Sequence, residues 1–138
     1  MANGVGSIIR LAAKHGPKIG VAATAIGGFL AKNPEVSAWL KGRVETLPKQ
    51  LDAIRKRRGD AAQIRGMLEI VRDVAGKLHA EGAAAAVASD WVRRADDVEL
   101  GVQLAERLSP PAKKEAVSRL KTRAEALLAE LIEATTAT

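Results

Sequence analysis

The sequence predicts an all-α protein, built as a multi-helix bundle with a long C-terminal antiparallel helical hairpin and short N-terminal helices. Hydrophobic residues make up 47% of the 138 residues but aromatic residues only 2%, so alanine and leucine must form most of the core. Alanine is the strongest helix former, and the β-branched and aromatic residues that strands favour are scarce. No stretch alternates cleanly between apolar and polar residues, as a half-buried strand would.

In the N-terminal half, Gly, Pro and capping residues fall between segments whose apolar side chains have helical spacing. They predict short helices, because Ser and Asn cap helix starts, Pro favours the first turn and Gly ends helices. The expected helices are 7–14 after Ser7, 17–32 between Gly16 and Asn33, 34–43 from Pro34, and 47–58 between Thr46–Pro48 and Gly59.

A longer helix is expected to begin at Asp60, which forms a capping-box pattern with Gln63, and to end at Gly82. Its apolar residues form one stripe at helical spacing. The stripe consists of Ile64, Met67, Leu68, Val71, Val74, Ala75 and Leu78.

The last third predicts the hairpin, because two apolar seams flank a break at Ser109, Pro110 and Pro111. The first seam is Ala84, Ala88, Trp91, Ala95, Val98, Val102 and Ala105, and the second is Val117, Leu120, Ala124, Leu127 and Leu131. Antiparallel packing would place Trp91 near Leu127 and Leu128. The same packing would place Arg93 and Arg94 near Glu125 and Glu130.

Two lysines, Lys113 and Lys114, begin the last helix, where the helix dipole disfavours cations. A partner on the other arm of the hairpin, such as Glu106 for Lys113, would offset that cost.

Positive charge is concentrated in one half of the chain, although the net charge of the whole is +6. Residues 1–72 hold 13 Lys and Arg against 5 Asp and Glu, whereas residues 73–138 hold 9 against 11. An anionic partner, whether phospholipid, nucleic acid or acidic protein, is therefore expected on the N-terminal half. We divide the chain into basic, glycine-containing amphipathic helices over 1–45 and a helical bundle scaffold over 46–138.

The N-terminal region has the pattern of a membrane-surface helix, because cations recur opposite an apolar face that ends in a Trp. The predicted membrane-binding residues are Arg10, Lys14, Lys18, Phe29, Lys32 and Trp39. The alternative is that the apolar face packs on the rest of the bundle. The longest uncharged run, 19–31, is too short to span a bilayer, which needs about 20 residues.

Small residues at Gly20, Thr24 and Gly28 recur every four positions. This spacing lets another helix approach closely, so it predicts packing inside the molecule or self-association. Lys14, His15, Gly16, Pro17 and Lys18 form a short stretch that is similar to leaderless membrane-active bacteriocin peptides. The resemblance implies a membrane-surface role for that stretch alone, because the chain is longer and poorer in Trp than those peptides.

The same region has basic residues, an apolar run and small residues at 36–38, as a secretory signal would. Its basic part is itself apolar and its apolar run is rich in glycine, so cleavage is not expected.

A second basic cluster predicts an alternative, nucleic-acid-binding surface, because clustered cations neutralise phosphates. Its residues are Lys41, Arg43, Arg55, Lys56, Arg57 and Arg58. The competing interpretation is a solvated helix end, with Asp52 pairing with Lys56. No aromatic residue lies between 41 and 65 to stack on bases.

Catalysis is not expected, because the chain has no Cys, only His15 and His79, and no nucleophile elbow, phosphate loop or dinucleotide motif. We predict no catalytic residue, metal or cofactor. The predicted function is a non-catalytic contact with an anionic membrane surface or a protein partner through the basic amphipathic N-terminal region. The alternatives are a nucleic-acid-binding protein using the 41–65 cluster and a structural homo-oligomer built on the C-terminal helices. The predicted location is cytoplasmic, peripheral on the membrane if the N-terminal region binds lipid.

Overall fold

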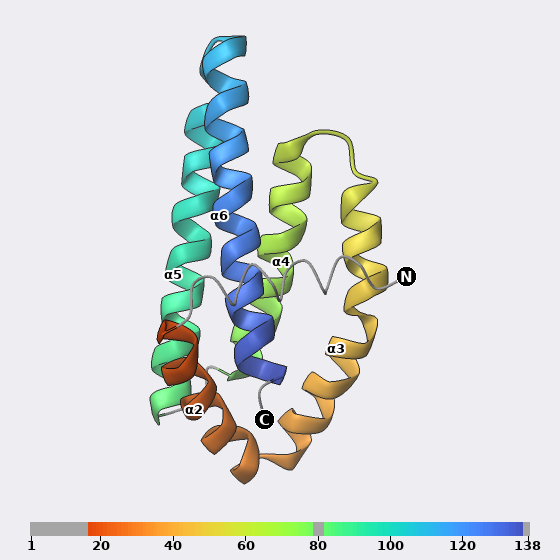
Figure 1. Ribbon diagram of the computed structural model, residues 1–138, viewed down its shortest axis with the longest axis vertical. Coiled ribbons are helices and arrows are strands. Elements are labelled where there is room, and N and C mark those ends of the chain that lie inside the picture. The colour runs from red at the N-terminus through yellow and green to blue at the C-terminus, as the bar shows by residue number, and fades with distance from the viewer. Residues whose placement is uncertain (1–16, 79–81, 137–138) are drawn as a thin grey trace.

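The computed structural model describes residues 17–78 and 82–136, with side chains from residue 22 onward. In these ranges the chain forms five helices and no strand, which confirms the all-α class (Figure 1). The helices are α2 (Pro17–Lys32), α3 (Pro34–Arg55), α4 (Asp60–Leu78), α5 (Gly82–Ala105) and α6 (Pro110–Thr136). The helix predicted over 7–14 lies outside the described residues.

Helices α4, α5 and α6 each contact the other two and form the centre of the fold. Helix α2 packs across one end of α5 and α6, and α3 runs back along α4 (Figure 1). At the opposite end, α5 and α6 extend beyond the start of α4, so their connected ends project from the bundle (Figure 1). The fold therefore has a covered end near α2 and a projecting end at the α5–α6 connection.

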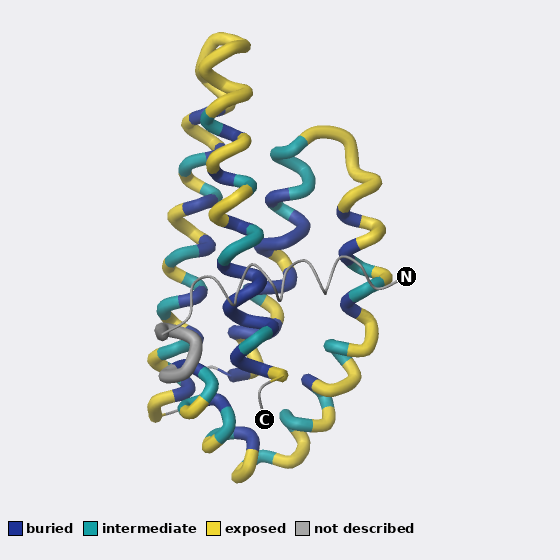
Figure 2. Tube along the Cα trace, in the orientation of Figure 1, coloured by how far each residue is buried: buried dark blue, intermediate teal, exposed yellow. Residues whose placement is uncertain are grey.

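The core follows the seams that periodicity predicts. Every residue of the predicted α4 stripe and of both C-terminal seams is buried. The second half of α6 is buried on more than the predicted face, because α2 covers it from a further side (Figure 2). The additional buried residues of α6 are Leu128, Ala129, Glu130, Ile132, Ala134 and Thr135.

The helix break predicted between 43 and 47 is wrong, because α3 continues through Pro48. Proline has no N–H to donate and normally interrupts a helix. The Thr46 hydroxyl donates to the Arg43 carbonyl over 2.9 Å, and Leu40 and Leu47 are buried on the same helix before the proline, as Leu51 is after it. Packing against the bundle on both sides of Pro48 thus keeps one helix where local sequence favours two.

Two predicted N-terminal caps act on the preceding helix instead. The Asn33 side chain makes no capping bond to α3, and its Nδ2 donates to the Phe29 carbonyl of α2 over 2.8 Å. The Gln63 amide, predicted to belong to a capping box, donates to the carbonyls of Arg55 and Arg57 at 3.3 and 3.1 Å. Both amides therefore satisfy carbonyls left open at a helix end.

The two predicted glycine stops have positive φ, +87° at Gly59 and +71° at Gly82. This left-handed conformation suits glycine, which has no Cβ to clash with the backbone. Gly59 lies between α3 and α4, and Gly82 begins α5.

Candidate interaction surfaces

The apolar face of α2 is part of the core. Ala22, Ile26 and Leu30 are at most 7% exposed, and α2 contacts both α5 and α6. Phe29 is partly buried against the same core. The apolar face of α2 therefore packs on the rest of the bundle, as in the alternative interpretation.

The Trp predicted to anchor the chain in a membrane contacts another helix. Trp39 is partly buried against the core, and the Lys77 ammonium of α4 lies 5.2 Å from the centroid of its ring. Such a cation–π contact is worth roughly 0.5–1 kcal/mol at a partly exposed site. Lys32, by contrast, is exposed. Arg10, Lys14 and the side chains of Lys18 and Gly20 lie outside the described part.

The glycine spacing of α2 does not coincide with a close helix contact at Gly28. Thr24 and Gly28 are both exposed, and a Cβ on Gly28 would meet no atom within 4 Å. The two residues line an open cleft between α2 and the first turn of α5. Self-association through this stripe stays a prediction.

Close approach occurs at two glycines that sequence reasoning missed. A Cβ on Gly66 of α4 would lie 2.7 Å from Ile54 Cγ1 of α3, and one on Gly101 of α5 would lie 2.7 Å from Leu120 Cδ2 of α6. The available signal was a glycine inside an otherwise helical pattern, which often indicates a tight packing contact.

The basic run at the end of α3 is exposed, but half of it is paired. Lys56 contacts Asp52 at 3.1 Å and Arg57 contacts Glu69 at 3.8 Å. The hydrogen bond and charge of Lys56 lower the pKa of Asp52. Arg55 and Arg58 have no acidic partner among the described residues.

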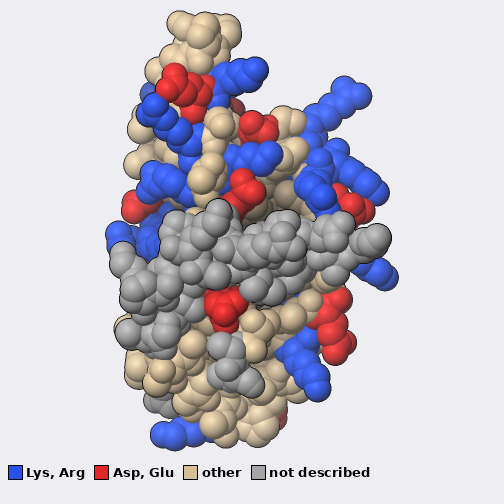
Figure 3. All heavy atoms as spheres, viewed as in Figure 1, with Lys and Arg blue, Asp and Glu red and all other residues tan. Residues whose placement is uncertain are grey.

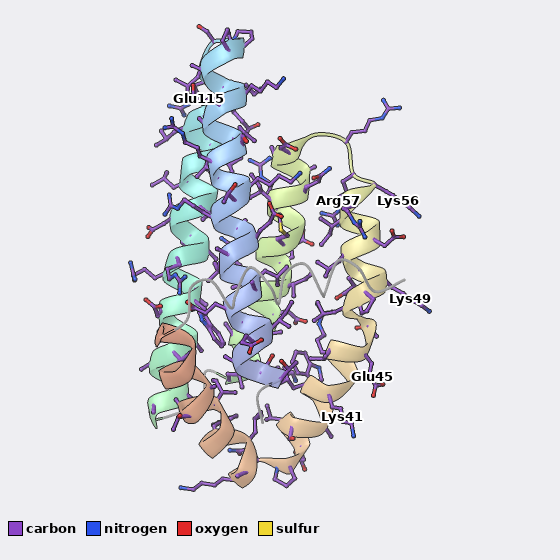
Figure 4. All side chains as sticks on the ribbon, viewed as in Figure 1. Lys41, Glu45, Lys49, Lys56, Arg57 and Glu115 are labelled. Atoms are coloured by element: carbon purple, nitrogen blue, oxygen red, sulfur yellow. The ribbon has the colours of Figure 1, made fainter. Side chains whose placement is uncertain are left out.

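Earlier in α3, Arg43 pairs with Asp73 of α4 at 2.7 Å and donates to the Gln50 side-chain oxygen. Lys41 and Lys49 are exposed without an acidic partner in the described ranges. Figure 4 shows Lys41, Lys49 and Lys56 directed away from the bundle, and Figure 3 shows Lys and Arg gathered along this edge of the molecule. We call the exposed cations of α3 and the turn after it that have no acidic partner in the described ranges, Lys41, Lys49, Arg55 and Arg58, the α3 basic edge.

The arginines of α4 are paired with acids of α5 and of the turn that follows it. Arg65 donates to Glu99 at 3.1 Å and to Glu106 at 2.6 Å, and Arg72 pairs with Asp96 at 2.9 Å. The hydrogen bonds of Glu106 and then Glu99 raise the pKa of Arg65. Glu106, the partner suggested by the sequence for Lys113, is therefore occupied.

The predicted contact between Arg94 and Glu130 is present, and Trp91 donates to the same carboxylate. Arg93 instead pairs on its own helix with Asp90 and Asp97. Of these two arginines, only Arg94 therefore forms an ion pair with α6.

Three leucines at the projecting end of the bundle are exposed, and sequence reasoning missed them. Leu100, Leu104 and Leu108 are 55%, 55% and 46% exposed. Leu100 and Leu104 are four residues apart on a face of 84–105 outside the predicted seam, and Leu108 continues the same spacing beyond it, which was the signal that could have found them.

Within the described ranges, no group of three or more His, Cys, Asp or Glu side chains is placed to hold a metal ion. No helix in the same ranges combines the length and the apolar character needed to cross a membrane. Comparison with known proteins identifies no relative, since no family model, curated protein or solved structure matches the chain.

Proposed function

We propose that the chain is a non-catalytic helical protein whose N-terminal half contacts an anionic membrane surface. In this proposal α4 to α6 are the scaffold, with α5 and α6 as its antiparallel hairpin. The observation that carries the proposal is the α3 basic edge, because its cations are exposed and lack acidic partners in the described ranges, whereas both arginines of α4 are paired. An unpaired basic surface of this kind favours an anionic partner.

The burial of the α2 face decides the kind of contact. Because Ala22, Ile26 and Leu30 belong to the core, inserting them into lipid would require α2 to leave the bundle. Contact through the α3 basic edge is therefore electrostatic, worth about 1 kcal/mol for each Lys or Arg near an anionic surface. Such binding weakens as salt screens the charges.

Flotation with phosphatidylserine-containing vesicles tests the proposal. The double variant Lys41→Gln/Lys49→Gln should bind at least about tenfold more weakly than the unaltered chain, given about 1 kcal/mol per cation. The control Arg93→Gln/Arg123→Gln removes the same charge from α5 and α6 and should bind nearly as well as the unaltered chain. Equal binding of the two double variants would contradict the α3 basic edge as the contact surface.

The predicted residues outside the described side chains need their own variant. Arg10→Gln/Lys14→Gln/Lys18→Gln should also weaken flotation if the N-terminal region lies on the membrane. Unchanged flotation of this triple variant, beside weaker flotation of Lys41→Gln/Lys49→Gln, would restrict the contact to the α3 basic edge.

Nucleic acid is the second candidate, favoured by the exposure of Arg55 and Arg58 at the same turn. Substituting the run 55–58 with Gln should weaken binding and flatten its dependence on salt, by a slope of about 0.9 for each phosphate that the protein no longer neutralises. An absence of affinity at about 50 mM salt would eliminate this candidate, because non-specific binding is strongest at low salt.

The homo-oligomer alternative has no such observation behind it. Both C-terminal seams are buried within a single chain, so an oligomer would have to use other surfaces.

A further inference from the structure

The projecting end of the α5–α6 pair, residues 100–115, is a separate exposed surface, which we call the α5–α6 tip. Residues 106–115 are all exposed, and the burial colours show this end free of neighbouring helices (Figure 2). Leu100 and Leu104 lie four residues apart on α5, and exposed Leu108 follows in the turn after the helix, before exposed Pro110 and Pro111. Single exposed leucines are common, but an apolar row at a projecting end is typical of a contact surface.

Three cations belong to the same segment as these leucines. Arg107, Lys113 and Lys114 are exposed and have no acidic partner among the described residues. The two acids of the same segment are already paired, Glu106 with Arg65 and Glu115 with Arg119, each at 2.6 Å. The charge left for a partner at this end is therefore positive.

The two lysines also occupy an unfavourable place in their helix. Lys113 and Lys114 lie near the start of α6, where the positive end of the helix dipole disfavours cations. Glu106, the acid that could offset this cost, is held by Arg65 on α4. Residues that break a local rule without an internal compensation often belong to a functional surface.

We propose that the α5–α6 tip inserts shallowly into an anionic membrane surface. The leucines enter the boundary between headgroups and acyl chains, and the three cations contact the phosphates, as in interfacial amphipathic segments. In Figure 3 the outermost part of the tip is uncharged, and both acidic and basic side chains lie immediately behind it.

Two other occupants fit the tip less well. A second copy of the chain meeting tip to tip would bring the cations of both copies together, which is repulsive. A nucleic acid would use the cations but not the leucines, and residues 100–115 contain no aromatic side chain to stack on bases. The tip also lies at the end of the bundle opposite α2 (Figure 1), so the inference does not depend on the α3 basic edge.

Partitioning of the full-length chain onto vesicles of phosphatidylcholine with and without phosphatidylserine tests the inference. Leu104→Gln/Leu108→Gln should lower binding to the anionic vesicles at least tenfold while circular dichroism stays unchanged. Lys113→Gln/Lys114→Gln should lower it severalfold, whereas Arg93→Gln/Arg123→Gln, which makes the same charge change away from residues 100–115, should not. Leu108→Trp should add fluorescence that brominated lipid quenches, beyond any quenching of the unaltered chain.

The outcomes separate this inference from the proposed function. Weaker binding of the tip variants with unchanged binding of Lys41→Gln/Lys49→Gln would support the tip and contradict the α3 basic edge. If Leu104→Gln/Leu108→Gln binds the vesicles as well as the unaltered chain, insertion of the α5–α6 tip is contradicted, regardless of the result for Lys41→Gln/Lys49→Gln. If light scattering shows a dimer that the leucine substitutions dissociate, the partner of the tip is a second copy of the chain, and membrane insertion is contradicted.

Discussion

Trp91 on α5 donates its indole N–H to Glu130 on α6 over 2.9 Å, inside the core. Arg94 donates to the same carboxylate oxygen from the edge of the core. Glu130 is 7% exposed and is the one charged residue that is buried in the described ranges. A buried carboxylate is tolerated when donors satisfy it, and here both donors come from the facing helix. The interaction therefore joins α5 to α6 at a defined register.

Removing this acceptor should destabilise the bundle. Glu130→Ala leaves the buried Trp91 N–H without a partner, which costs about 1–3 kcal/mol of unfolding free energy. Glu130→Gln keeps a carbonyl oxygen at the same place and should lose less. Urea unfolding of both variants measures the difference, and equal losses would show that the acceptor is not what matters.

The tight contact at Gly66 gives a prediction with a control on the same helix. Gly66→Ala should destabilise the protein by about 1–3 kcal/mol, the usual cost of overpacking, because its Cβ would lie 2.7 Å from Ile54 and 2.9 Å from Arg57. Gly76→Ala adds the same methyl group to α4 where no atom lies within 4 Å, and should stabilise it by up to about 1 kcal/mol. Thermal unfolding that moves both variants in the same direction would refute the contact.

Asp90 predicts an acid-dependent part of stability. Burial raises its pKa, but the hydrogen bond from Arg93 and the charge and hydrogen bond of Arg94 outweigh burial and hold it below the ordinary 3.8. A depressed pKa in the folded state contributes stability that is present above pH 3.8 and is lost as pH falls through the lower folded value. Asp90→Asn should therefore lose less unfolding free energy than the unaltered chain as the pH falls from neutral to below that value. Parallel pH profiles for the two proteins would refute this contribution.

Arg65 connects the scaffold to the α5–α6 tip. Arg65→Met frees Glu99 and Glu106, and the second of these lies beside the cations of the tip. The stability cost should be at most about 1 kcal/mol, because the pairs are partly exposed. Binding to anionic vesicles should nevertheless fall severalfold. Arg72→Met frees only Asp96, further from the tip, and is the matched control; equal binding of the two variants would contradict the link.

Local sequence patterns predicted most of the helical framework. The seam of α5 from Ala84 to Ala105 was complete, and the predicted stripe of α4 missed only Ile70 among its buried apolar side chains, because the 3.6-residue period of a helix determines which side chains share a face. The bounds of α2 and the position of Gly59 between α3 and α4 followed from the same local rules.

Tertiary packing decided the rest of the fold and the candidate surfaces. Because of packing, α3 continues through Pro48, and the Asn33 and Gln63 amides donate to carbonyls at the end of the preceding helix. Packing also buries the apolar face of α2, which the sequence alone predicted to contact lipid. It also paired Glu106 with Arg65, which left the cations of the α5–α6 tip without an acid in the described ranges. By itself the sequence determined the helices and their apolar faces, because these depend on neighbours three or four residues apart. Which faces are covered and which charges stay free depends on helices distant in the chain, and only the assembled bundle brings those together.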